Sequence, residues 1–389
     1  MIELIDELNA GAYFVGSAAI GASFELSHQG LVAVLYLAPA ALALVLEPVI
    51  FVLADRWPRR AFVAGGLATM ALASLACALA PTPAALAAAI TVGALAGSCG
   101  VELAQATLAD LHPDGREQVL ARWTLFGAVG DLAAPLLVAV LAGVGLGWRT
   151  GFAVMAAVLA AWAVLIARAP FPAPTRPTAP DAPAAEDGEA EPGILDALLA
   201  ALRERRLLGW LAATALCDLL DELLVLLAAV HLRDQLGAGP VARSLVLAGH
   251  VLAAIAALAV LERLLERHRP ERLLAAAAVA CAAALVAWLA TPWLWLSAIL
   301  FAVVGATAAP LYPLAMAQSY AALPGRSGAV HAAARVFTPG SLVLPWLLAW
   351  LADHVGTQAA LAVIAAGPAS IAILAVALTA RGGASSPRV

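Results

Sequence analysis

The feature that most restricts the fold of this chain is a succession of apolar blocks, each long enough to cross a membrane. Residues 31–46, 61–80, 272–290 and 357–380 are almost free of charged side chains. An α-helix of roughly 20 apolar residues crosses the hydrocarbon core of a bilayer, whereas membrane β-strands give short alternating segments, which the sequence lacks. The chain is 63% hydrophobic and 12% charged, while a soluble domain carries about 25% charged residues. We therefore predict an all-α polytopic membrane protein.

Twelve membrane spans fit this pattern. They cover about residues 3–25, 31–53, 61–80, 84–110, 118–143, 148–168, 207–235, 241–262, 272–290, 293–322, 327–354 and 357–380. Between the sixth and seventh spans, residues 169–193 are rich in Pro and Ala and predict an extended linker. The segment ILDALLAALRERR (194–206) then predicts an amphipathic helix on the inner membrane surface.

The predicted organisation is a six-helix bundle, a cytoplasmic linker with its amphipathic helix, a second six-helix bundle and a cytoplasmic tail. These parts cover residues 1–168, 169–206, 207–380 and 381–389. The orientation follows from arginine, because the chain contains no lysine. With both termini inside, 18 arginines fall on the cytoplasmic side and only Arg149, Arg233 and Arg243 fall outside. Cytoplasmic loops are enriched in positive residues, so both termini are predicted to be cytoplasmic.

The two halves of the chain repeat three short patterns in the same order. The pairs are ELIDEL (3–8) with DLLDEL (218–223), DRWPRR (55–60) with ERHRPER (266–272), and GDLAAPLL (130–137) with GSLVLPWL (340–347). In the last pair Gly130 corresponds to Gly340, and Pro135 to Pro345. In the first pair the acids are spaced i, i+3 and i+4, which gathers them on one face of an α-helix. Duplicated halves of this kind are typical of secondary transporters, whose substrate site lies between the repeats.

The loop after the second span resembles the signature of the major facilitator superfamily, G-x-L-a-D-R-x-G-R-R. In the stretch LADRWPRR, the matching positions are Asp55, Arg56, Arg59 and Arg60. Phe51 and Pro58 stand where the signature has glycines. The resemblance covers the whole chain in the number, order and length of its spans.

Two further segments carry the same resemblance. GWRTGF (147–152) is similar to the segment that opens the sixth helix of many members. Gly130-x-x-x-Ala134-Pro135 resembles the Gly-Pro motif in the fifth helix of proton-driven exporters, with Ala134 in place of the usual glycine. In detail the chain is most similar to the bacterial drug-efflux branch that includes fosmidomycin-resistance-type exporters.

The resemblance implies twelve transmembrane helices in two six-helix bundles related by pseudo-twofold symmetry. These bundles would rock about a central site to give alternating access, with helices 1, 4, 7 and 10 lining the cavity. Asp55 and the arginines around it would form a cytoplasmic latch in the outward-facing state. The resemblance also implies a monomer in a bacterial-type inner membrane.

Acidic residues inside the predicted spans are the candidates for proton coupling and substrate binding. They are Asp6, Glu7, Glu102, Asp131, Asp221 and Glu222. An ionised acid at the bilayer centre costs about 2.5–3.5 kcal/mol, so these groups must face a wet cavity, find partners or bind protons. Purely structural roles for these acids stay open, because acids also favour a helix N-terminus and polar groups can pack between helices.

Two smaller sets complete the candidate site. Residues predicted to line the cavity are Gln105, Asp218 and Tyr312, and residues predicted to form the cytoplasmic gate are Glu47, Asp55, Arg56, Arg59 and Arg60. Gln105 is one helical turn from Glu102, and Tyr312 lies between two prolines that are expected to kink its helix.

The favoured function is a proton-coupled secondary transporter that exports a small neutral or cationic organic molecule as an antiporter. One alternative is an uptake symporter for a metabolite or a metal cation, and another is a membrane receptor or scaffold that transports nothing. The sequence has no nucleotide-binding P-loop, HExxH or serine-nucleophile motif. We therefore expect no enzymatic activity, no cofactor, no metal centre and no nucleic-acid partner; the expected partners are protons, a small-molecule substrate and the lipid bilayer.

Overall fold

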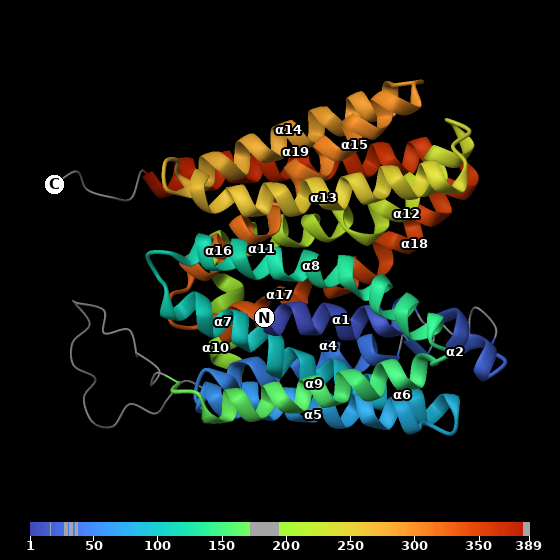
Figure 1. The fold of residues 1–389 in the computed structure, drawn as a ribbon. Helices are drawn as coiled ribbons and strands as arrows, with labels where there is room; N and C mark the ends of the chain where they lie inside the picture. Colours follow the sequence, from blue (N-terminus) through green and yellow to red (C-terminus); the bar gives the residue numbers. More distant parts are fainter. Residues whose placement is uncertain (16, 27–29, 31–33, 36–37, 172–193, 384–389) are drawn as a thin grey trace. The chain divides into compact units, whose positions relative to one another are not determined.

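The structure is a computed structural model, and it describes every residue except 16, 27–29, 31–33, 36–37, 172–193 and 384–389. Within this described part all regular elements are helices, as Figure 1 shows. The prediction of an all-α membrane protein is confirmed by this architecture. The predicted linker falls largely on 172–193, outside the described residues.

Nine helices of the described part are long and apolar enough to span a membrane, with lengths of 21 to 29 residues. They match nine of the twelve predicted spans. The remaining three contain shorter helices: span 3–25 holds α1 (Ile2–Val15) and α2 (Ser17–Ser23), span 31–53 holds α4 (Ala38–Ala54), and span 207–235 is divided. The seventh predicted span is therefore not one continuous helix.

The chain divides into two compact units. Unit 1 comprises residues 1–113, 126–203 and 323–335, and unit 2 comprises residues 114–125, 204–322 and 336–389. Each unit thus includes one short segment from the other half of the sequence. The predicted bundle boundaries at 168 and 207 stay a prediction.

Unit 1 is built mainly from the first half of the sequence. Besides α1, α2 and α4, its helices are α5 (Arg59–Leu79), α6 (Pro83–Gly97), η2 (Ser98–Glu102), α7 (Leu103–Leu111), most of α8 (Arg116–Gly143), α9 (Trp148–Arg168), α10 (Ile194–Arg203) and α17 (Ser327–Ala334). α5 packs against α6 and α9 (Figure 1), and α4 packs against α6 and α17. The predicted amphipathic helix is α10, which ends at Arg203 and packs against α17 and α4.

A tight crossing in unit 1 positions the middle of the fourth predicted span. η2 is a π-helical turn between α6 and α7, of a kind that is frequent at functional sites. A Cβ atom at Gly66 of α5 would lie 2.7 Å from the Cα of Gly100. Only glycine at both positions lets the two backbones approach so closely. This crossing fixes the helical turn that carries Ser98 and Glu102.

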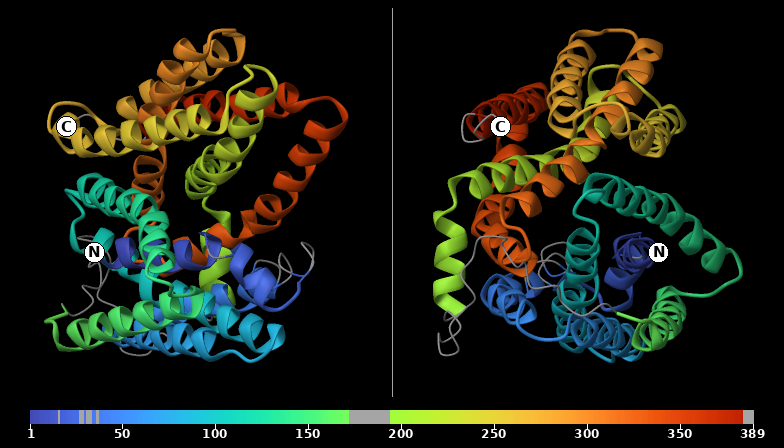
Figure 2. Two further views of the ribbon diagram at one scale, coloured as in Figure 1. Left: turned by 45° about the vertical axis from the view of Figure 1, so that its right-hand side comes forward. Right: turned by 90° about the vertical axis from the view of Figure 1, so that its left-hand side faces the viewer.

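Unit 2 contains α11 (Arg205–Cys217), η3 (Asp218–Leu220), α12 (Glu222–Asp234), α13 (Pro240–Leu265), α14 (Pro270–Ala290), α15 (Leu294–Ala308), α16 (Leu311–Ala322), most of η4 (Arg335–Phe337), α18 (Thr338–His354) and α19 (Thr357–Gly383). α14 packs against α15 and α19, and α13 packs against α15; Figure 2 shows the orange α14 and α15 side by side. The packing of α14 on α15 and α19 repeats that of α5 on α6 and α9 in unit 1. The packing of α13 on α15 repeats that of α4 on α6. The duplication seen in the sequence therefore extends to the packing within each unit.

Large apolar side chains cover the outside of many of these helices. Leu72 and Leu79 of α5 are 68% and 71% exposed, and Ile373 and Val376 of α19 are 70% and 61% exposed. A soluble protein rarely exposes such continuous apolar surface. In a bilayer, however, lipid tails cover these side chains, while each helix satisfies its own backbone hydrogen bonds.

Candidate functional site

The first acidic stripe is helical and faces other acids of unit 1. α1 carries Glu3, Asp6 and Glu7, and all three are partly buried. Asp6 lies close enough to Glu102 and Asp131 for their charges to interact, and Glu7 lies close enough to Asp131 for the same interaction. Like charges that are crowded away from water favour the uptake of a proton by one of them. The contact between α1 and α8 is therefore a candidate proton site.

Glycines of α8 allow α1 to come this close. A Cβ atom at Gly130 would lie 2.7 Å from the Cβ of Glu7 and 2.8 Å from the carbonyl oxygen of Leu4. A Cβ atom at Gly127 would lie 3.1 Å from the Cγ of Glu3. The two glycines thus give the acidic face of α1 a closely packed partner.

Replacing Gly130 with alanine is expected to lower the free energy of unfolding by about 1–3 kcal/mol, because the added Cβ would overlap α1. Gly143, in the same helix, has nothing within 4 Å of its Cβ position. Gly143→Ala is the matched control and should be neutral or slightly stabilising. Unfolding of both purified variants in detergent measures the difference; equal effects would contradict the tight contact between α1 and α8.

The second acidic stripe does not form the helical face that its spacing predicts. α11 ends at Cys217, η3 covers Asp218–Leu220, and Asp221 has φ −98° and ψ −114°, which is outside the helical region. The first stripe lies at the start of a helix, where the helix dipole favours negative charge; the second follows 13 helical residues of α11, where the dipole disfavours it. The helix therefore breaks at these acids and a new one begins at Glu222.

A charged network ties α17 and η4 to two spans of the first half of the sequence. Arg335 Nε lies 2.6 Å from Glu47 Oε2, and Arg335 Nη2 lies 2.5 Å from Glu102 Oε1. His331 Nδ1 is 3.1 Å from Glu102 Oε2, and the Ser98 hydroxyl donates a hydrogen bond to Glu47. Glu47 is only 5% exposed, and a carboxylate so buried needs a cation or hydrogen-bond donors. Arg335 and Ser98 supply them.

A second set of contacts holds the N-terminal end of α17. The Asp55 carboxylate accepts hydrogen bonds from the backbone amides of Gly328 and Ala329, at 2.9 and 2.8 Å. Amides in the first turn of a helix are unpaired within it and lie at the positive end of its dipole, so they suit a carboxylate. Burial raises the pKa of Asp55 above its ordinary value, while Arg59 and these two amides act in the opposite direction. The partners therefore offset part of the cost of burying this charge.

Arg59 is the centre of this second set. Its guanidinium pairs with Asp55 and donates a hydrogen bond of 3.0 Å to the Ser327 hydroxyl. The Ser327 hydroxyl in turn donates a bond of 2.5 Å to Asp110. We call Asp55, Arg59, Asp110 and Ser327 the latch. It contains two residues of the loop signature, and it contacts the first residues of α17.

Replacing Arg59 with alanine is expected to lower the free energy of unfolding by about 2 kcal/mol, because a partly buried carboxylate and a hydroxyl lose their partner. Arg60, the exposed neighbour, is the matched control. Arg60→Ala should change stability by less than about 0.5 kcal/mol. Thermal unfolding of the two variants checks this, and an equal loss in both would show that the latch contributes nothing specific.

The remaining predicted residues are not brought into one cluster. Gln105 is buried on α7 at 4% exposure, Tyr312 is partly buried on α16, and Arg56 is exposed. Asp218 and Asp221 are exposed at the break between α11 and α12. The side chain of Glu222 lies outside the described residues. The residues of unit 1 that do meet are Asp6, Glu7, Asp131 and Glu102. Glu102 shares Arg335 with Glu47, while Asp55 contacts the first turn of α17 separately.

Sequence reasoning missed the partners of these acids. Asp110, Ser327, His331 and Arg335 were not candidates, although each contacts a predicted residue. One signal was available, because His331 and Arg335 are spaced i and i+4 within a predicted span and so share a helix face. A basic pair inside a span implies acidic partners, just as the acids imply basic ones.

Unit 2 has a cavity of about 310 Å³ at the break between α11 and α12. One side is formed by the end of α11, η3 and the start of α12, and the other by η4 and α18. The lining residues are Ala212, Ala215, Leu216, Asp218, Leu219, Leu223, Phe337, Gly340, Ser341, Leu344 and Pro345. Asp218 is therefore the one ionisable group in an otherwise mainly apolar wall.

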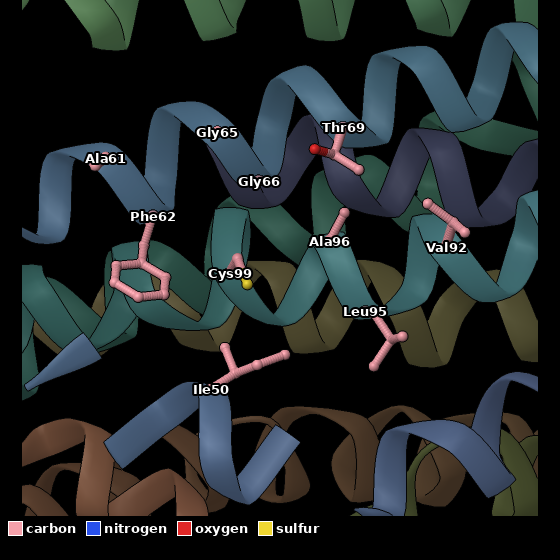
Figure 3. Close-up of a pocket in the computed structure, with 10 residues that line it drawn as sticks. All are labelled: Ile50, Ala61, Phe62, Gly65, Gly66, Thr69, Val92, Leu95, Ala96 and Cys99. Carbon is pink, nitrogen blue, oxygen red and sulfur yellow. The ribbon is translucent and has the colours of Figure 1, made fainter. Parts of the chain in front are cut away.

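Unit 1 has a cavity of about 350 Å³ between α4, α5, α6 and η2 (Figure 3). It is lined by Ile50, Ala61, Phe62, Gly65, Gly66, Thr69, Val92, Leu95, Ala96 and Cys99. The wall offers one hydroxyl, one thiol and no carboxylate, so it has no counter-charge for a ligand. Within the described residues, no group of three or more His, Cys, Asp or Glu side chains is arranged to hold a metal ion.

Solved structures of known proteins resemble the whole fold. The fucose:proton symporter FucP of E. coli aligns with a TM-score of 0.73 at 15% identity, covering 97% of each chain. A bacterial homologue of the iron transporter ferroportin, in an outward-facing state, aligns with a TM-score of 0.73 at 16% identity over 98% of each chain. The proton:xylose symporter XylE gives a TM-score of 0.68 at 12% identity, covering 96% of this chain and 92% of its own. Curated protein sequences give no match.

The duplicated helical architecture and these likenesses define the fold of a polytopic membrane protein. The family model described as Major Facilitator Superfamily matches residues 7–218. The chain therefore belongs to the major facilitator superfamily, as the loop signature at Asp55–Arg60 indicates.

Proposed function

We propose that the protein is a proton-coupled secondary transporter that works by alternating access and exports a small neutral or cationic organic molecule. The observation that carries this proposal is the crowding of the Glu7 and Asp131 carboxyl groups where α1 packs closely on Gly130 of α8, because neighbouring carboxyl groups with little access to water favour uptake of a proton. Asp6 and Glu102 extend this group of acids. Like charges crowded in a poorly hydrated space favour proton uptake, so the group can load and unload a proton as its access to water changes.

Arg335 and His331 provide the link from proton binding to movement. Both contact Glu102, and a protonated Glu102 would no longer attract the guanidinium of Arg335. Arg335 would then hold α17 through Glu47 alone. We propose that protonation of Glu102 loosens this end of α17 and favours release of the latch at its other end. The proton-free and proton-loaded forms would thereby prefer different conformations, which is what coupling requires.

Export is supported by the Gly-Pro segment of α8. Gly130 is tightly packed against α1 beside the acidic group, at the position where the exporter motif has its first glycine. A role in drug efflux, as in the fosmidomycin-resistance-type branch, is part of this proposal. Asp221 and Glu222 of the second stripe are proposed as further proton or substrate groups.

An uptake symporter is the second candidate. It is supported by the likeness to FucP and XylE, both named as proton symporters. The two directions differ in one observable, because an antiporter moves substrate against the proton flow and a symporter moves it with the flow.

The location in the cell follows from the arginine distribution. We propose a monomeric, multi-pass protein of a bacterial-type inner membrane with both termini in the cytoplasm, because 18 of 21 arginines lie on that side in this topology. Labelling of single cysteines introduced at the termini with a membrane-impermeant reagent would check the orientation in intact cells.

Transport in proteoliposomes tests the proposed function. A screen of organic cations and neutral molecules for stabilisation of the purified protein at two pH values first identifies a ligand, because ligands that bind the folded state raise its apparent stability. The ligand is then followed across the membrane under an imposed pH gradient. We expect flux opposite to the proton gradient, lost when Glu7, Asp131 and Glu102 are replaced by their amides. Undiminished flux in that variant would refute the assigned proton sites, and ligand binding without any flux would favour a receptor.

A further inference from the structure

The cavity of unit 1 between α4, α5, α6 and η2 opens at the surface of the molecule. Gly65, Thr69 and Val92 in its wall are exposed, and a Cβ atom at Gly65 would meet no described residue within 4 Å. Leu72, on the same face of α5 as Gly65 and Thr69, is 68% exposed, so this face is one that lipid tails cover. The cavity of about 350 Å³ is therefore a groove that a lipid can enter from the side. We call it the α4–α5–α6 groove.

The wall of this groove suits a hydrocarbon chain. Ile50 of α4, Phe62 of α5 and Leu95 of α6 lie between the helices, as Figure 3 shows. None of the described lining residues is charged, and their polar side-chain atoms are the Thr69 hydroxyl and the Cys99 thiol. A charge placed inside the groove would thus be buried without a partner, which is unfavourable. An acyl chain, in contrast, would bury only apolar surface against the wall.

One end of the groove lies at the predicted cytoplasmic surface. The lining residues of α5 run from Ala61 to Thr69, just after the helix begins at Arg59. This stretch rises about 12 Å along the helix, which fits within the roughly 15 Å of hydrocarbon in one leaflet. Trp57 is 59% exposed, and its ring centroid lies 6.1 Å from that of Phe62. Tryptophan is enriched at the boundary between lipid and water, so the groove begins at the level of the inner headgroups.

A positive charge is present at this end of the groove. Arg60 directly precedes the first lining residue of α5, its side chain is exposed, and within the described part of the chain it forms no ion pair. Its neighbour Arg59 is engaged in the latch. Arginine binds phosphate groups through two parallel hydrogen bonds. An apolar groove that ends beside such a guanidinium fits a lipid with a phosphate in its headgroup.

The acids at the same end favour a headgroup with a net negative charge. Asp55 and Asp110, the two acids that contact Arg59, are already engaged in the latch. The ammonium of a zwitterionic headgroup would therefore find neither carboxylate available. An anionic headgroup needs only the arginine, and arginines at the cytoplasmic membrane surface attract anionic lipids.

We infer that the α4–α5–α6 groove binds a phospholipid of the inner leaflet with an anionic headgroup, such as phosphatidylglycerol. Its phosphate lies at Arg60, and one acyl chain lies beside Phe62, Ile50 and Leu95. The lipid contacts both α4 and α5, which flank the loop with the latch residue Asp55. Binding to the folded protein alone raises its apparent stability by mass action. This inference concerns a membrane partner and does not depend on the direction or coupling of transport.

Titration of the delipidated full-length protein in detergent with dioleoylphosphatidylglycerol tests the inference. Thermal unfolding and native mass spectrometry are the two readouts. We expect a saturable rise in the unfolding temperature and an adduct of one lipid. Dioleoylphosphatidylcholine has the same tails and no net charge. It should bind about fivefold more weakly, because the attraction of one arginine for an anionic lipid corresponds to about that factor.

A charge variant tests the role of Arg60. Arg60→Gln should weaken the binding of dioleoylphosphatidylglycerol about fivefold, for the same reason. Arg267→Gln is the matched control, because Arg267 is an exposed arginine of the corresponding loop in the second half. It should bind the lipid as the wild type does. Equal weakening in the two variants would show that the lipid responds only to overall charge, and it would overturn the assignment to Arg60.

A second variant tests the groove without changing its charge. Gly65→Leu should abolish the lipid adduct and the lipid-dependent stabilisation, because the new side chain would fill open space in the groove. Without lipid this variant should unfold at or above the temperature of the wild type, because leucine favours a helix more than glycine does. Gly249→Leu is its control, since Gly249 of α13 also faces open space but lies outside the groove.

Two results would overturn the inference. One is a Gly65→Leu protein that elutes as a single species on size exclusion and still binds dioleoylphosphatidylglycerol with the affinity of the wild type. The other is a wild type that binds the anionic and the zwitterionic lipid equally well.

Discussion

Replacing Arg335 with methionine is expected to lower the free energy of unfolding by about 3 kcal/mol. The substitution removes the cation that lies 2.6 Å from Glu47 and 2.5 Å from Glu102. Glu47 is 5% exposed, so it would remain as an unpaired buried carboxylate, and breaking a buried pair in this way costs about 3–5 kcal/mol. We use the lower end of this range because the Glu102 side chain is 34% exposed. Denaturant unfolding of the purified protein in detergent measures the effect.

Two variants show whether the loss comes from the unpaired charges. Adding Glu47→Gln and Glu102→Gln to the Arg335→Met protein should restore much of the stability, because a neutral set no longer buries a lone charge. Arg122→Met is the control for ordinary ion pairs: Arg122 pairs with Glu262 but its side chain is 61% exposed, so its loss should cost about 0–1 kcal/mol. If Arg335→Met is no more destabilised than Arg122→Met, the ion pairs of Arg335 contribute no more to the free energy of unfolding than an exposed ion pair does.

Replacing Glu7 with glutamine is expected to uncouple transport from the pH gradient. For an electroneutral exchange of one proton for one monovalent cation, each unit of pH difference supports about a tenfold substrate gradient. The wild type should approach this limit in proteoliposomes. In the variant residue 7 can no longer bind the coupling proton, so the accumulation ratio should fall to about one while exchange of substrate for substrate continues.

The exchange reaction is the internal control, because it needs the substrate site but no net proton movement. Glu25→Gln is the matched control variant, since Glu25 is an acid of the first half outside the described acidic group. It should accumulate substrate as the wild type does. An accumulation ratio in Glu7→Gln equal to that of the wild type would place the coupling proton elsewhere.

The fold was largely predictable because its main determinant is local. An apolar block of about 20 residues can only be a membrane helix, and the boundaries of α5, α9 and α14 follow directly from such blocks. The break at Asp218–Asp221 was not predicted, because the spacing of its acids is the same as in α1. Only the position of the acids within the helix, at the start in one copy and after 13 residues of α11 in the other, separates the two outcomes.

Only the acidic residues of the candidate site were predictable from the sequence; their partners were not. Burying a carboxylate in a membrane has a cost that can be read from the sequence, so Glu47, Glu102 and Asp131 could be selected as candidates. Their partners depend on tertiary contacts: Arg335 is 233 residues from Glu102, and Ser327 is 217 residues from Asp110. No local pattern encodes such a pairing. For this reason the latch was expected around Asp55, while its other half in α17 was missed.

The most direct test of the central claim is infrared difference spectroscopy of the purified protein between neutral and alkaline pH. The claim is that the neighbouring carboxyl groups of Glu7 and Asp131 bind a proton at neutral pH because they are crowded where α1 packs on α8. The account predicts a protonated-carboxyl stretch at neutral pH that disappears in Glu7→Gln and in Asp131→Asn but persists in Glu25→Gln. A spectrum without a protonated carboxyl at neutral pH, or one that neither substitution changes, would contradict it.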